Sequence, residues 1–250
     1  MIRFATLALL AAPLALAACD SASDGGVGGS GETFDPVAAP EGASWVDTAT
    51  ATPEGGFLIG NPDAPVKVVE FASHTCGGCA SFAETGAAAL KADYIPTGTV
   101  SYEIRNLIRD PIDLTIATLA RCGDPAAFHP LSDQAWAQLN TINQTINQNG
   151  AAAQAALEGP PELRFVGIAQ AAGLIDFFAA RGVSRNQAQA CLTDTAKIEA
   201  VVETSQEQVE RFNVQSTPTF LINGENVGPQ SWETLETMIQ EAGGAKAGAQ

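Results

Sequence analysis

Hydrophobic and polar residues follow strand-like and helix-like patterns in two separate parts of the chain. Residues 66–71 form a short β-branched run, which predicts a buried central strand. Apolar residues between 79 and 90 recur at the spacing of one helical face, and those between 100 and 104 alternate as in a second strand. The order strand, helix, strand predicts a βαβ unit, with a Cys-x-x-Cys motif at residues 76–79 where the helix begins.

Strand signals vanish between residues 110 and 197, where Ala, Leu, Gln and Asn dominate, so we expect a helical insertion over this range. The pattern then reverts to helical spacing over residues 198–212 and to a strand at 219–222. Asn223-Gly224 predicts a hairpin turn, and Ser231 can cap a last helix. We expect this ββα ending to complete the α/β domain that the βαβ unit begins.

The first eighteen residues have the pattern of a removable export signal. A basic start at Arg3 precedes an almost entirely apolar run over residues 4–18, which is too short for a convincing membrane span. The run ends in Leu16-Ala17-Ala18-Cys19, which resembles the lipobox of bacterial lipoproteins. We therefore expect cleavage after residue 18 and a lipid anchor on Cys19. The alternative is an ordinary secretory signal with a chance cysteine.

Low-information segments flank the predicted domain. Residues 19–55 are rich in Gly, Ser, Asp, Ala and Pro, which predicts a flexible tether. Within them, Phe34 and Trp45 either pack on the domain or are stray aromatic residues. Residues 243–250 predict a disordered tail.

Composition narrows the classes of function. The chain has 250 residues, of which 46% are hydrophobic, so general disorder is excluded. Its 12 Lys and Arg against 28 Asp and Glu give a net charge of −16, which argues against a nucleic-acid partner. Of the five cysteines, only two stand close together, whereas a zinc ribbon needs a second close pair. We therefore expect neither a metal nor a cofactor.

The motif Cys76-Gly77-Gly78-Cys79 predicts thiol chemistry. At the start of a helix, unpaired backbone N–H groups and the helix dipole stabilise a thiolate on the first cysteine. One turn later, the second cysteine comes within bonding reach and can resolve a mixed disulfide. We therefore expect Cys76 to be the attacking, exposed thiol and Cys79 the buried, resolving one. A purely structural disulfide is the alternative.

Residues 70–79 (EFASHTCGGC), followed by residues 215–220 (QSTPTF), resemble the DsbA-type thioredoxin family over about residues 56–242. The resemblance implies an α/β protein, a thioredoxin fold with an inserted helical domain. The thioredoxin-like domain would comprise residues 56–109 and 198–242, and the insertion residues 110–197. It also implies a periplasmic thiol:disulfide oxidoreductase.

The resemblance also assigns residues around the motif. Pro218 matches the family's cis-proline, which faces the Cys-x-x-Cys motif and leaves the backbone of Thr217 free to pair with a substrate strand. Glu70 matches a buried acid beneath the motif, where desolvation would raise its pKa and let it take a proton from Cys79. The alternatives are the start of an edge strand at Pro218 and a solvated glutamate at residue 70.

DsbA-like proteins commonly have Pro-His between the cysteines, whereas Gly77-Gly78 supplies no side-chain donor. His74 either compensates for this missing donor by lying near the Cys76 sulfur or is an exposed loop residue.

Some DsbA relatives carry a second disulfide in the insertion, which implies a pairing of Cys122 with Cys191; two buried free thiols are the alternative.

Our leading hypothesis is an enzyme anchored on the periplasmic side of a bacterial membrane, a monomer that exchanges disulfides with unfolded or misoxidised envelope proteins. A membrane redox partner would recycle it. Residues 20–55 are too short for the dimerisation domain of dedicated isomerases, which favours the oxidase direction over isomerase or reductant. The alternatives are a non-catalytic peptide-binding module and a copper- or haem-delivery thiol protein, although with only two His and two Met the chain has no metal-handling stretch.

Overall fold

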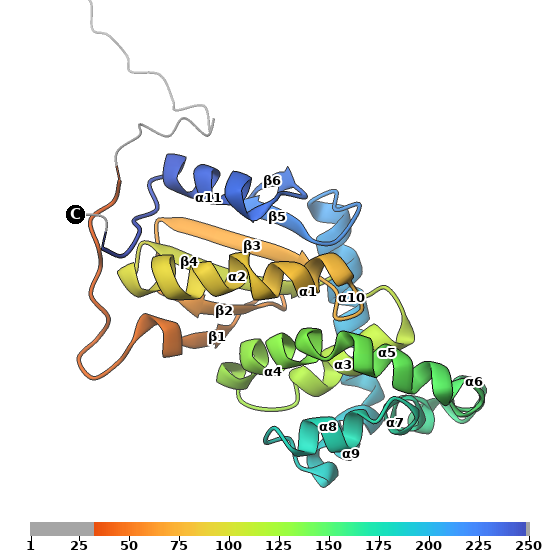
Figure 1. Ribbon diagram of the computed structural model, residues 1–250. Helices are drawn as coiled ribbons and strands as arrows, with labels where there is room; N and C mark the ends of the chain where they lie inside the picture. The colour runs from red at the N-terminus through yellow and green to blue at the C-terminus, as the bar shows by residue number, and fades with distance from the viewer. Residues whose placement is uncertain (1–32, 249–250) are drawn as a thin grey trace, which may run out of the picture.

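The computed structural model describes residues 33–248, so the predicted signal peptide and Cys19 lie outside the described residues. A central sheet is covered by helices, and further helices gather at one side of it (Figure 1). In chain order the elements are η1 (Trp45–Asp47), β1 (Ala49–Ala51), β2 (Phe57–Gly60), β3 (Val66–Ala72), α1 (Gly77–Glu84), α2 (Gly86–Ala89), η2 (Leu90–Tyr94), η3 (Ile95–Thr97), β4 (Val100–Asn106), α3 (Pro111–Ala120), α4 (Pro125–Ala137), α5 (Leu139–Gln148), α6 (Gly150–Glu158), α7 (Pro161–Ala171), α8 (Leu174–Ala179), α9 (Arg185–Thr193), α10 (Thr195–Arg211), β5 (Thr219–Ile222), β6 (Glu225–Gly228) and α11 (Trp232–Glu241).

The sheet has six strands in the order β1-β2-β4-β3-β5-β6. Strands β3 and β4 are parallel, as the βαβ pattern predicts, and the other neighbours are antiparallel. All residues of β3 except Lys67 are buried, because helices cover both faces of this central strand. The hairpin between β5 and β6 turns at Asn223 and Gly224, both with positive φ.

The helix after the motif is not continuous to residue 90. It breaks at Thr85, between α1 and α2, and continues as the π-helix η2. The Thr85 hydroxyl donates to the carbonyl of Ser81 at 2.9 Å, a side-chain bond of the kind that bends helices. Gly86 leaves room for the ring of Phe82, which a Cβ there would meet at 2.2 Å.

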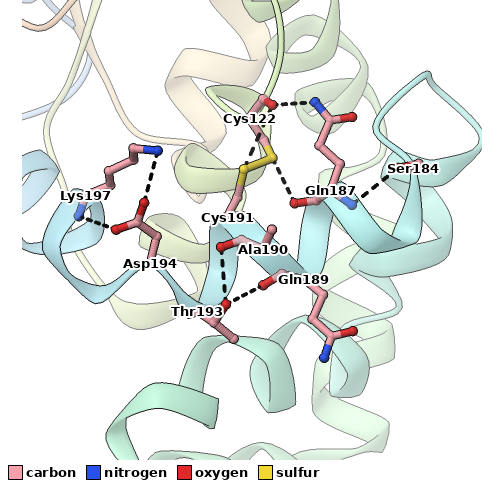
Figure 2. Close-up of a disulfide and its surroundings, with 9 residues drawn as sticks. All are labelled: Cys122, Ser184, Gln187, Gln189, Ala190, Cys191, Thr193, Asp194 and Lys197. Carbon is pink, nitrogen blue, oxygen red and sulfur yellow. Dashed lines mark hydrogen bonds and ion pairs between the residues drawn. A yellow bond between two sulfur atoms is a disulfide. The ribbon is translucent and has the colours of Figure 1, made fainter.

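Helices α3 to α9 form the insertion, and a disulfide joins Cys122, just after α3, to Cys191 in α9. Figure 2 shows Gln187 beside it, with its side-chain amide donating to the carbonyl of Cys122 at 2.6 Å. Helix α10 begins at Thr195 and runs across the predicted boundary at residue 197 back to the sheet.

The predicted tether over residues 19–55 is wrong for its described part, residues 33–55. Strand β1 extends the sheet at its edge, and Trp45 is buried with 9% of its surface exposed. The backbone N–H of Val37 donates to the carbonyl of Thr97 at 2.8 Å. Of the two aromatic residues, Trp45 packs on the domain and Phe34 is exposed.

The predicted disordered tail is also wrong for residues 243–248. Ala245 is buried, and its backbone N–H donates to the hydroxyl of Thr99 at 2.9 Å. The ammonium of Lys246 lies 2.8 Å from a carboxylate oxygen of Glu236. Residues 249 and 250 lie outside the described residues.

Candidate active site

Cys76 and Cys79 lie at the start of α1, directly beyond the end of β3. Cys76 is the N-cap residue with extended backbone, and its sulfur accepts a hydrogen bond from the backbone N–H of Cys79 at 3.4 Å. Both residues are free thiols and both are buried, with 5% of Cys76 and none of Cys79 exposed. The expectation of an exposed Cys76 is therefore wrong, because its Sγ lies 3.3 Å beneath the carbonyl oxygen of Thr217.

The two thiols have opposite acidities. The pKa of Cys76 falls to about 5, chiefly because the thiol of Cys79 donates to its sulfur. Hydrogen bonding with Thr217 and the backbone N–H groups of Cys79 and Gly78 add to this. The pKa of Cys79 rises far above its ordinary value, because its proton is held by Cys76 and because burial disfavours a second charge. Cys76 can therefore act as a nucleophile at neutral pH while Cys79 keeps its proton.

A second loop closes over the motif from the strand on the other side of β3. The peptide bond between Thr217 and Pro218 is cis, and β5 begins directly after it. Because Phe71 pairs with Thr219 across β3 and β5, this loop and the motif meet at the same edge of the sheet. A Cβ on Gly78 would lie 3.1 Å from Cδ of Pro218, so the two loops are in close contact.

Glu70 lies on β3 beneath the motif and is 1% exposed. Burial raises its pKa to about 8, although a hydrogen bond from Tyr102 works in the opposite direction. The Tyr102 hydroxyl donates to Oε2 of Glu70, and Oε1 is buried with no hydrogen-bond partner among the described residues. Sequence reasoning placed Tyr102 on a strand but missed this contact, which only the register of β3 and β4 reveals.

The expectation that His74 is an exposed loop residue is wrong, and its ring contacts the insertion. It is fully buried, its ring stacks on Trp136 at 5.0 Å, and its Nε2 lies 3.0 Å from the Ser132 hydroxyl. Asp113 accepts from the backbone N–H of His74 at 2.7 Å. Trp136 donates to the Ser73 carbonyl at 2.9 Å. These contacts, which sequence reasoning missed, tie the insertion to the loop that carries Cys76.

Of the expected site residues, the structure brings five together: Glu70, Cys76, Cys79, Thr217 and Pro218. Cys122 and Cys191 lie apart from them, in the insertion. His129 is a buried residue whose Nε2 lies 2.8 Å from the carbonyl oxygen of Phe57. In residues 33–248 we find no cluster of side chains suited to a metal ion, and no helix there is long and apolar enough to cross a membrane.

Comparison with known proteins identifies the family. The family model described as "Thioredoxin" matches residues 52–241. A protein-disulfide isomerase from Novosphingobium aromaticivorans is 31% identical, with a TM-score of 0.69 over 74% of this chain and 95% of that one. Wolbachia pipientis alpha-DsbA1, at 18% identity, has a TM-score of 0.60 over 74% of this chain and 90% of that one, and so shows the fold alone.

A Rickettsia conorii protein named "Putative protein-disulfide oxidoreductase" is 27% identical over 197 residues. The match covers 76% of this chain but only 61% of that protein's length. The predicted fold class, a thioredoxin fold with an inserted helical domain, is confirmed by the family model and the structural neighbours. The chain belongs to the thioredoxin family and has the DsbA-like form of its fold.

Proposed function

We propose that this protein is a thiol:disulfide oxidoreductase that exchanges disulfides with protein substrates through Cys76 and Cys79. The observation that carries the proposal is the placement of the two free thiols. Cys76 caps α1 and its sulfur accepts from the backbone N–H of Cys79 at 3.4 Å, whereas Cys79 is fully buried. This placement lowers the pKa of Cys76 to about 5 and strongly raises that of Cys79. A structural pair would need no such difference, whereas an attacking thiolate and a resolving thiol do.

The reaction has two displacements. The Cys76 thiolate attacks a substrate disulfide, so that a mixed disulfide forms and one substrate thiolate leaves. Cys79 then passes its proton to the Glu70 carboxylate and attacks the Cys76 sulfur. The Cys76–Cys79 disulfide forms, the second substrate thiolate leaves, and two electrons have passed to the substrate. In the oxidase direction the same steps run backwards, and Glu70 returns the proton to Cys79.

Thr217 and Pro218 are the proposed substrate platform. The Thr217 carbonyl lies 3.3 Å from the Cys76 sulfur. An extended substrate segment that pairs with this backbone would therefore bring its own sulfur next to Cys76. Such pairing recognises the substrate backbone and not its side chains, which suits unfolded or misoxidised proteins as substrates.

Exchange between the reduced protein and a disulfide-containing peptide tests the proposal. We expect rapid exchange by the wild type, none by Cys76→Ser, and a mixed disulfide that persists on Cys76 in Cys79→Ser. Exchange at the wild-type rate by the variant with both cysteines changed to Ser would contradict the proposal. Undiminished peptide binding by that variant, with no exchange by the wild type, would instead favour a non-catalytic binding module.

We propose the oxidase direction, because a low pKa at Cys76 stabilises the reduced pair and so makes the disulfide a stronger oxidant. The reduction potential, measured by equilibration with glutathione and thiol trapping, decides the direction. A value close to about −120 mV, as in DsbA, supports an oxidase. A value close to about −270 mV, as in thioredoxin, would indicate a reductant or isomerase instead.

We also propose that the protein acts on the periplasmic side of a bacterial membrane as a monomer, anchored through lipidated Cys19 and recycled by a membrane redox partner. The Cys122–Cys191 disulfide supports an oxidising compartment, and the lipobox-like residues 16–19 support the anchor. We expect wild-type protein to fractionate with membranes and Cys19→Ala to be released from them. Equal membrane association of both would contradict the anchor.

A further inference from the structure

We propose that Tyr102 is a positioning residue for Glu70: its hydroxyl holds Oε2 and leaves Oε1 to take the proton of Cys79. The inference rests on the proposed function and adds a residue to it. Tyr102 lies on β4, where it pairs with Val68 of β3, two residues from Glu70. Its hydroxyl donates to Glu70 Oε2, while Oε1 has no partner in the part of the chain that the structure describes.

The donor is permanent in the range of pH where the enzyme would act. Tyr102 is fully buried, and this burial, together with the neighbouring Glu70, raises the pKa of its hydroxyl well above the ordinary value. The phenol therefore keeps its proton when the carboxyl loses its own. A hydrogen bond from a neutral donor favours the ionised carboxylate, because the charged acceptor is bound more strongly than the neutral one.

This bond counteracts the effect of burial on Glu70. Without this bond, desolvation would hold the acid protonated to a higher pH, and a protonated Glu70 can accept no proton from Cys79. Hydrogen bonding by Tyr102 is the largest effect that lowers its pKa, which stands at about 8. A general base is most effective when its pKa is close to the working pH, so the hydroxyl brings Glu70 towards that range.

The other titratable groups near Glu70 are weaker candidates for lowering its pKa. None of these groups hydrogen-bonds Glu70, and Lys91 is itself paired with Asp133. His129 lies with its ring 5.4 Å from that of Tyr102 and has a pKa lowered to about 3, chiefly by burial, so it is neutral in the range considered. The charged or titratable groups that face Glu70 and Tyr102 are Cys76 and Cys79 at the start of α1, Lys91 in η2, and His129 and Asp133 in α4.

The chain supplies a matched control. Its other tyrosine, Tyr94, is also buried and also donates to a carboxylate, Oε1 of Glu236 at 2.7 Å, which belongs to α11. Tyr102→Phe and Tyr94→Phe therefore each remove, from a buried ring, a hydroxyl that donates to a carboxylate; Tyr94→Phe also removes the acceptor of the Gln240 side-chain amide at 2.8 Å. Only the first removal touches Glu70.

The test follows the mixed disulfide of Cys76 with glutathione. Reduced full-length protein is mixed with oxidised glutathione, quenched in acid at intervals, and analysed by mass spectrometry at several pH values. Formation of the adduct reports Cys76, and its decay reports the attack by Cys79. The variant lacking both cysteines corrects for any other thiol.

We expect Tyr102→Phe to form the adduct at the wild-type rate but to resolve it about ten-fold more slowly at pH 7, with the midpoint of the pH profile moved up by about one pH unit. Tyr94→Phe should match the wild type in both steps. Glu70→Gln should resolve slowly without that midpoint, and adding Tyr102→Phe to it should change nothing further. A purely structural tyrosine would leave the midpoint where it is.

Several results would overturn the inference. One is a wild-type midpoint in Tyr102→Phe, and another is a further loss when Tyr102→Phe is added to Glu70→Gln. If Glu70→Gln resolves like the wild type, the inference fails while exchange through Cys76 stands. If the wild type forms no adduct, the proposed function fails first. Infrared spectroscopy measures the pKa of Glu70 independently of activity, through the carboxyl band of its protonated form. The band is assigned by its loss in Glu70→Gln. In Tyr102→Phe it should titrate about one pH unit higher than in the wild type. An unmoved band would also overturn the inference.

Discussion

At the scale of single residues, the chemistry of the active-site motif depends on the groups that surround each of its four residues. Cys76 receives hydrogen bonds from the start of α1, whereas Cys79 is enclosed by the core and by Glu70. Between them, Gly77 and Gly78 supply no side-chain donor, so the low pKa of Cys76 comes from Cys79, from Thr217 and from backbone groups. The departure from Pro-His therefore leaves the thiolate stabilised.

The two glycines are not equivalent, and alanine at each should show it. A Cβ on Gly77 meets nothing within 4 Å, whereas one on Gly78 would lie 3.1 Å from Pro218 and 3.7 Å from the Cys76 sulfur. We expect Gly77→Ala to keep full exchange activity and to stabilise the protein by about 0.5–1 kcal/mol, since alanine favours a helix. Gly78→Ala should slow exchange several-fold by crowding the substrate platform. Equal exchange rates for the two variants would contradict this account of the contact.

Glu70 makes stability depend on pH with a defined sign. Its pKa is about 8 in the folded protein against an ordinary 4.5, so between these values the native state holds a proton that the unfolded state has lost. The stability this group contributes is present below about pH 4.5 and is lost as the pH rises towards 8. Reduced wild-type protein should therefore lose free energy of unfolding, relative to Glu70→Gln, between pH 5 and pH 8. Denaturant unfolding at both values checks this, and parallel behaviour of the two proteins would refute it.

At the scale of elements, the local sequence pattern was sufficient to predict strands and turns whose structure depends on residues close together in the sequence. The β-branched run 66–71 lies within β3, and the turn at Asn223 and Gly224 has the positive φ angles that a tight hairpin needs. The break at Thr85 escaped prediction because apolar spacing continues through it. The role of Asp113, which binds the backbone of His74 from 39 positions away, depends on tertiary contact alone.

The disulfide in the insertion joins α9 to the end of α3 and closes a loop of 69 residues. On the chain-entropy model, a loop of this length stabilises the fold by about 4 kcal/mol. We expect Cys122→Ser with Cys191→Ser to lower the free energy of unfolding by about this amount and to leave the reactivity of Cys76 unchanged. Chemical denaturation measures the first and alkylation kinetics the second. A stability equal to that of the wild type would contradict the structural role.

At the scale of the whole molecule, the ends of the chain were hardest to predict. Residues 33–55 have the composition of a linker, but Val37 bonds to Thr97 and Trp45 donates to the Val37 carbonyl at 2.7 Å. Gly98, with φ of +71°, makes room for this contact, since a Cβ there would meet the Val37 oxygen at 2.3 Å. Such long-range pairing leaves no local periodicity in the sequence, whereas the site residues were found because they share short motifs.

Truncation of Trp45 tests whether this segment belongs to the fold. Because its side chain is buried, we expect Trp45→Ala to lower the free energy of unfolding by about 3 kcal/mol. Phe34→Ala, at an exposed position in the same segment, should change it by less than about 0.5 kcal/mol. If both changes had equal and negligible effects on the free energy of unfolding, the prediction of a flexible tether would be supported instead.

The measurement that tests the central claim most directly is the pH dependence of alkylation of Cys76 in the reduced protein. Iodoacetamide reacts with the thiolate, so the rate follows ionisation of the sulfur, and Cys76→Ser corrects for other thiols. We predict a midpoint near pH 5, with full reactivity retained at neutral pH. A midpoint near about 8.5, the value of an ordinary cysteine, would contradict it.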